Sequence, residues 1–153
     1  MEHAAVVYFS QTGTTANAAA AIHQVVGGPL IELHRQPAYP TSYKALVAAA
    51  QAERDTRTVP ALMPLTASLG DVTTVFLGFP SWWAQPPMVI NAFFASEDLQ
   101  GKTIVPFTTS VSSTIEESMA TLQQLATAAG ATLATGLTAT GNGDIDAFMA
   151  QYH

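Results

Sequence analysis

The sequence contains no cysteine and little charge of either sign. Among its 153 residues only five are Lys or Arg and eleven are Asp or Glu, which gives a net charge of −6. Without cysteine, disulfides, thiol catalysis and Cys-ligated metals are excluded. The few basic residues also argue against a nucleic-acid partner, because phosphate backbones are bound by clustered Lys and Arg.

Long apolar runs are missing too, although 48% of the residues are hydrophobic. No run reaches the ~18 residues that a membrane-spanning helix needs. The N-terminus shows no basic segment followed by an apolar stretch and a cleavage site, as a signal peptide would. We therefore expect a globular, cytoplasmic protein that makes no membrane contact. Since neither an internal repeat nor a linker is visible, residues 1–153 are expected to form a single domain.

Apolar runs alternate with helical patterns along the whole chain. Strands are predicted at 4–9, 29–34, 72–79, 102–107 and 131–137, and helices at 14–26, 43–54, 86–96, 115–129 and from Asp144, as its cap, to the C-terminus. No hairpin signal joins any two strands. This order predicts an α/β fold with a parallel sheet covered by helices on both faces.

Three of the predicted strands end in loops of unusual composition. Residues 10–15 include four hydroxyls and one glycine, residues 80–83 include both tryptophans, and five of the six residues 108–113 carry hydroxyls. The carboxyl ends of parallel strands lie at one edge of a sheet, where ligands bind. We therefore expect these loops to lie together.

The first loop has the form of an anion site. A strand that turns directly into a helix presents free backbone N–H groups and the positive end of the helix dipole, and phosphate is the usual ligand. No Lys or Arg lies in the turn, so neutral donors alone would hold a phosphate. Taken singly, each loop has an ordinary explanation as a helix cap, as packing or as a surface turn. Together they favour a ligand with a phosphate, a polar linker and a planar ring.

These motifs resemble those of the flavodoxin family. Ser10-Gln11-Thr12-Gly13-Thr14-Thr15 resembles the phosphate loop, the segment 77–83 looks like the flavin-flanking loop after the third strand, and 98–110 is similar to the fourth strand and its loop. Tyr39-Pro40, Tyr43 and Glu53 resemble a subgroup of short flavodoxin-like proteins. The resemblance covers nearly the whole chain. It implies a flavodoxin-like three-layer sandwich with strand order 2-1-3-4-5 and bound FMN.

The resemblance also implies a set of cofactor-binding residues. The phosphate would be held by Ser10, Thr12, Gly13, Thr14 and Thr15 and by the backbone N–H of Gln11. Pro80 and Ser81 would lie along the ribityl chain and the ring edge, and either Trp82 or Trp83 would cover one flavin face. The pyrimidine edge would be followed by Thr109, Ser110, Val111, Ser112 and Ser113.

The sequence departs from the subgroup at three places. Val111 and Ser112 stand where glycines are usual, and glycine reaches backbone angles that valine reaches only with strain. Ala84 likewise stands where a glycine is common. No tyrosine occurs in the fourth-strand loop, so a flavin held between two aromatic rings is not expected. The more open face would suit a small substrate or a hydride donor.

The resemblance implies an electron carrier that passes electrons between redox partner proteins. The alternative is an FMN-dependent NAD(P)H:quinone-type oxidoreductase that acts on a small-molecule acceptor. A receiver-type signalling domain shares the topology, but the positions where it needs acids hold Ser10-Gln11 and Pro80-Ser81. The four histidines are far apart, so no metal site is expected. Either a monomer or a homodimer agrees with the sequence.

Overall fold

A parallel sheet forms the centre of the computed structural model, which describes residues 1–152. Its strands are β1 (Ala4–Tyr8), β2 (Leu30–Glu32), β3 (Thr74–Pro80), β4 (Thr103–Thr109), β5 (Thr132–Leu133) and β6 (Leu137–Thr138). The order is β2-β1-β3-β4, and β5 and β6 both pair with β4. The predicted order 2-1-3-4-5 is confirmed, with the fifth position shared by two short strands.

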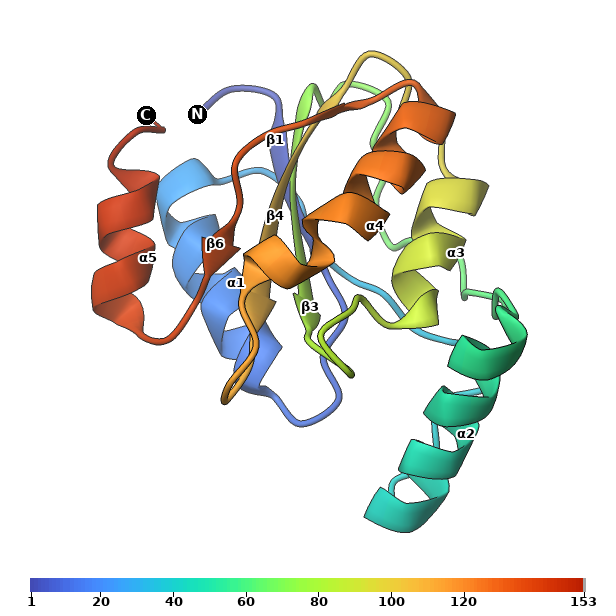
Figure 1. Cartoon of the computed structure of the whole chain (residues 1–153). Helices are drawn as coiled ribbons and strands as arrows, with labels where there is room; N and C mark the ends of the chain where they lie inside the picture. Colours follow the sequence, from blue (N-terminus) through green and yellow to red (C-terminus); the bar gives the residue numbers. More distant parts are fainter. Residues whose placement is uncertain (153) are drawn as a thin grey trace.

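Of the five helices in residues 1–152, four cover the two faces of this sheet. The helices are α1 (Thr14–Val26), α2 (Tyr43–Thr56), α3 (Met88–Ser96), α4 (Ile115–Ala129) and α5 (Asn142–Met149). Figure 1 shows α1 and α5 on one side and α3 and α4 on the other. Alternate residues of β1 supply the two cores: Val7 packs in the cluster of α3 and α4, and Val6 in that of α1 and α5. The predicted three-layer sandwich is therefore confirmed.

Helix α2 is the exception, because it projects from the body instead of covering the sheet (Figure 1). Only Ala50 and Glu53 of its residues are buried. Ser42 caps its start by accepting the backbone N–H of Ala45 at 3.4 Å. The helix is thus anchored mainly through its C-terminal half.

The prediction of one continuous strand over 131–137 is wrong, and Pro106 explains the break. The carbonyl oxygens of Lys102, Ile104 and Thr108, in and just before β4, accept the backbone N–H groups of Thr132, Ala134 and Ala139. Pro106, which stands between Ile104 and Thr108, has no N–H to continue the ladder. A side chain at Gly136 would also lie 2.8 Å from the Pro106 carbonyl oxygen. The pairing therefore stops after β5 and resumes at β6.

Two smaller differences also concern where elements begin and end. Strand β4 runs two residues further than predicted, so Thr108 and Thr109 are buried strand residues and not loop residues. The last helix begins at Asn142 after Gly141, which places Asp144 in its first turn and not at its cap. An acid there still complements the helix dipole.

Candidate functional site

The β1–α1 loop folds around the side chain of Ser10. The Ser10 Oγ accepts the backbone N–H groups of Gly13 at 3.1 Å and of Ala16 at 3.2 Å. Its own O–H remains available to donate. Within residues 1–152, no protein group accepts the backbone N–H of Thr12, Thr14 or Thr15. Three free donors at the start of α1 are what an anion site requires.

Thr109 joins this loop to the other two. Its Oγ1 lies 2.6 Å from the Oγ1 of Thr15, and both side chains are buried. Its carbonyl oxygen accepts the backbone N–H of Ser81 at 3.0 Å. The end of β4 therefore fixes the positions of both the β1–α1 loop and the tryptophan loop. Figure 1 shows the three loops at the same edge of the sheet, at the bottom of the view.

A pocket of about 390 Å³ opens among these loops. Eight of the predicted site residues line it, together with Ala139 and Thr140: Gln11, Thr12, Thr14, Thr15, Pro80, Thr109, Ser110 and Val111. Ser10 and Gly13 shape the turn beside it. Ser112 and Ser113 do not line it, and their backbone N–H groups are bonded to the Ser110 Oγ.

The tryptophans sit on a tight turn from Trp82 to Gln85. The backbones of these two residues exchange hydrogen bonds of 2.9 and 3.0 Å. Trp83 and Ala84 between them have φ angles of +51° and +63°. Positive φ at both central residues is the mark of a type I′ turn, which normally takes glycine or asparagine. A glycine at position 84 would adopt this geometry without strain.

The two indole rings have different surroundings. Trp82 faces inward, with its ring centroid 5.6 Å from that of Phe9 and 5.4 Å from that of Tyr39. Trp83 is 45% exposed, and the guanidinium of Arg54 lies 4.3 Å from its ring centroid. Trp82 is therefore held by its neighbours, whereas Trp83 lies at the tip of the turn.

A buried hydroxyl without a partner lies beside the turn. The Ser81 Oγ is inaccessible to solvent and has no hydrogen-bond partner among the described residues. An unpaired buried hydroxyl is costly, so native proteins rarely retain one without a ligand or water. Ser81 therefore suits contact with a polar ligand group.

Helix α2 supplies a wall of the site that sequence reasoning missed. Tyr43, Leu46, Val47 and Ala50 face Ser81, Trp82 and Trp83 across a hollow of about 270 Å³. Their spacing of i, i+3, i+4 and i+7 puts them on one helix face, and this pattern could have been read from the sequence. Pro80 lines the first pocket and its neighbour Ser81 lines the hollow, so the two adjoin at these residues.

Behind the tryptophan turn lies a buried polar cluster. The Glu53 carboxylate accepts the Nε–H of Arg35 at 2.9 Å and the hydroxyl of Tyr39. Arg35 also stacks on the Tyr39 ring, 4.3 Å from its centroid. Burial, reinforced by the bond to Glu53, raises the pKa of Tyr39 far above its ordinary value. Tyr39 therefore stays neutral and donates at any physiological pH.

The loop after β4 does not need the glycines that the subgroup has. Neither Val111 nor Ser112 has a positive φ. The Val111 side chain is fully exposed. The departure at these positions therefore introduces no backbone strain.

The fold and this edge place the chain in the class of doubly wound α/β proteins, whose ligands bind where the strand order reverses, here between β1 and β3. The sequence profile of one such family, described as flavodoxin, matches residues 3–143. The chain belongs to the flavodoxin family. No curated protein sequence gives a significant match.

Solved structures support the same assignment. A protein from Bacteroides uniformis described as a flavoprotein is 31% identical, with 96% of this chain and 97% of that chain covered and a TM-score of 0.84. A similarly described protein from Bacteroides eggerthii is 32% identical over 97% and 96% of the chains, with a TM-score of 0.83. A flavoprotein from Lactobacillus acidophilus, solved in complex with FMN, shares the fold at 15% identity, with a TM-score of 0.81 over 99% of both chains. Within residues 1–152, no helix is long and apolar enough to cross a membrane.

Proposed function

We propose that this protein binds FMN at the carboxyl edge of its sheet and carries electrons between redox partners. The observation that supports this most is the junction at Thr109, which holds three ligand-type loops around one pocket. FMN is the cofactor that membership of the flavodoxin family indicates. The L. acidophilus neighbour, which has the same fold, contains FMN.

The residues present fit the parts of FMN. The free N–H groups of Thr12, Thr14 and Thr15 would hold the phosphate, with Gln11, Gly13 and the hydroxyl of Ser10 completing the turn. The unpaired hydroxyl of Ser81 would meet the ribityl chain or the ring edge beside Pro80. Trp82 and Trp83 offer the aromatic surface for the ring. The loop Thr109 to Ser113 would follow the pyrimidine edge.

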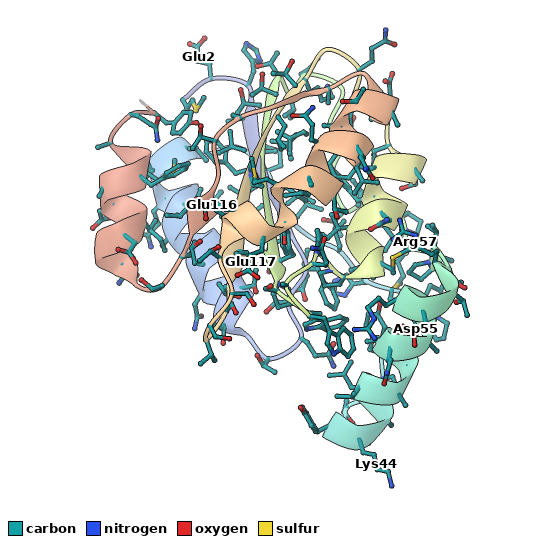
Figure 2. All side chains as sticks on the ribbon, in the orientation of Figure 1. Glu2, Lys44, Asp55, Arg57, Glu116 and Glu117 are labelled. Carbon is teal, nitrogen blue, oxygen red and sulfur yellow. The ribbon has the colours of Figure 1, made fainter. Side chains whose placement is uncertain are left out.

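FMN supplies the redox chemistry when bound, and the protein supplies binding, orientation and electrostatics. No basic side chain belongs to the phosphate loop, and four of the five Lys and Arg lie within residues 35–57. Figure 2 shows Lys44 on α2, Arg57 directly after the end of α2, and the acidic Glu116 and Glu117 at the start of α4. We expect the overall negative charge to disfavour a further electron on the reduced ring. The potential of the second reduction step is then lower than in free FMN.

The visible spectrum of the purified protein tests the cofactor. Absorption bands of oxidised flavin, with FMN released by acid, are expected. A colourless protein that fails to bind added FMN would refute the proposal.

Anaerobic addition of NADPH to the loaded protein then separates the carrier from the alternative. A carrier keeps its flavin colour until a partner reductase is added. Rapid bleaching by NADPH alone would favour the NAD(P)H:quinone-type oxidoreductase. One observation favours that second candidate: the hollow between α2 and the tryptophan turn is open to small molecules and is lined by Tyr43, Leu46, Val47 and two indoles. Turnover with a soluble quinone would support it.

A further inference from the structure

The tryptophan turn has a conformation that its own residues disfavour. Trp83 and Ala84 both have positive φ, and neither is a glycine. Such backbone persists only where the surrounding structure holds it in place. The contacts that hold this turn therefore have a function beyond general packing.

Helix α4 holds the turn from one side. The Ser118 hydroxyl, which is completely buried, donates to the carbonyl oxygen of Ala84 at 3.0 Å. The Gln85 side chain donates to the carbonyl oxygen of Glu117 at 3.0 Å and accepts from the Thr121 hydroxyl at 2.5 Å. Three hydrogen bonds from two turns of one helix thus fix Ala84 and Gln85.

The cluster around Glu53 holds the turn from the opposite side. The Tyr39 ring packs edge-on against Trp82 with its hydroxyl bonded to Glu53. Arg35 pairs with the same carboxylate and covers the Tyr39 ring. Glu53 is buried although it belongs to the projecting helix α2. Its carboxylate therefore fixes Tyr39, which in turn fixes Trp82.

We propose that Ser118 and Glu53 are positioning residues, which hold the turn 82–85 between α4 and α2 as a preformed aromatic wall for the flavin. The inference rests on the proposed FMN site. A wall that is already ordered lowers the entropy cost of binding, so the two residues act on FMN affinity without touching the cofactor. Helix α4 begins directly after the loop that follows β4. The bond from Ser118 to Ala84 therefore also connects that loop to the tryptophan turn.

Substituting Ser118→Ala tests the α4 side. Losing one buried hydrogen bond that supports strained backbone should weaken FMN binding about tenfold and shift the midpoint potential of the flavin. Thr127→Ala is the matched control, because it removes an exposed hydroxyl from the same helix away from the turn. Its FMN dissociation constant should stay within about twofold of the wild-type value.

Ala84→Gly tests the role of strain. Glycine adopts positive φ without cost, so the turn should then need less support. The effect of Ser118→Ala on FMN affinity should be several-fold smaller in the Ala84→Gly background. Equal effects in both backgrounds would contradict the proposal.

Glu53→Ala and Glu53→Gln test the α2 side. The alanine variant should weaken FMN binding, and the glutamine variant should restore part of it, since its amide oxygen still accepts from Tyr39. If Ser118→Ala and Glu53→Ala lower thermal stability but leave FMN affinity and potential unchanged, their role is structural and the proposal fails.

If the wild-type protein binds no FMN, the proposed function is overturned. The order of the turn can still be measured in the FMN-free protein, by amide hydrogen exchange. Exchange at the N–H groups of Trp82 and Gln85 should be about tenfold faster in Ser118→Ala than in Thr127→Ala. Equal exchange rates would overturn the positioning role in its own right.

Discussion

The pair Thr15–Thr109 gives the sharpest test of how the site is built. Among the described residues each hydroxyl has only the other as its partner, at 2.6 Å, and the two residues are 1% and 6% exposed. Replacing either by valine keeps the shape and removes one hydroxyl. The remaining hydroxyl is then buried without a partner.

The expected magnitudes follow from this burial. An orphaned buried hydroxyl costs about 1–3 kcal/mol, whereas removing both partners together is nearly neutral. Thr15→Val and Thr109→Val should each lower the free energy of unfolding by about 2 kcal/mol, and the double variant by less than either. A loss of that size lowers Tm by roughly 4–8 °C in a chain of this length.

Urea unfolding of the FMN-free wild type, both single variants and the double variant measures the coupling. The free protein is used so that lost phosphate contacts do not enter. If the two single losses in the free energy of unfolding simply add in the double variant, the two hydroxyls are not coupled. The claim that their hydrogen bond joins the loops would then be wrong.

Three further predictions follow from buried contacts. Gly78→Ala should destabilise the fold by about 1–3 kcal/mol in chemical unfolding, because its Cβ would lie 2.2 Å from the Phe107 ring; an unchanged midpoint would contradict this packing. Burial raises the pKa of Glu97, so stability falls as the pH rises from the ordinary value through the raised one, and it stays lower above it. Glu97→Gln should therefore raise Tm at pH 7 but not at pH 4, and an equal gain at both would count against burial as the cause. Burial and Glu53 raise the pKa of Tyr39, so its stabilisation is complete below pH 10 and declines above it as the unfolded chain ionises. Tyr39→Phe should be less stable at pH 7 and show a smaller alkaline decline in a pH series of unfolding curves, because Tyr8 and Tyr152, whose pKa values burial also raises, still contribute to it.

The alternation of strands and helices could be predicted because each strand is buried on both faces and each helix has an apolar side. The meeting of the three loops could also be predicted, since parallel strands end at one edge, and Thr109 bonds to residues of both other loops. The broken fifth strand was not predicted. Pro106 is visible in the sequence, but its effect falls on the neighbouring strand, far along the chain, and local reading misses such an effect.

The tryptophan turn and the α2 wall were beyond local reading for a different reason. A type I′ turn without glycine contradicts local preference, and tertiary bonds from Ser118 and Thr121 hold it. Helix α2 is bonded to the body through Glu53, whose partners Arg35 and Tyr39 are distant in sequence. The division of the predicted site residues between the pocket at Thr109 and the hollow at α2 could be seen only in the structure.

The junction at Thr109 has a consequence for how this protein can change over evolutionary time. One residue bonds the first loop through its side chain and the tryptophan loop through its carbonyl oxygen. A substitution there alters two binding loops at once, so an adaptive change in one loop carries a penalty in the other. New specificity is therefore more accessible at positions outside this junction. Val111, which lines the pocket at Thr109, and Tyr43, which lines the hollow at α2, are such positions, and both are highly exposed.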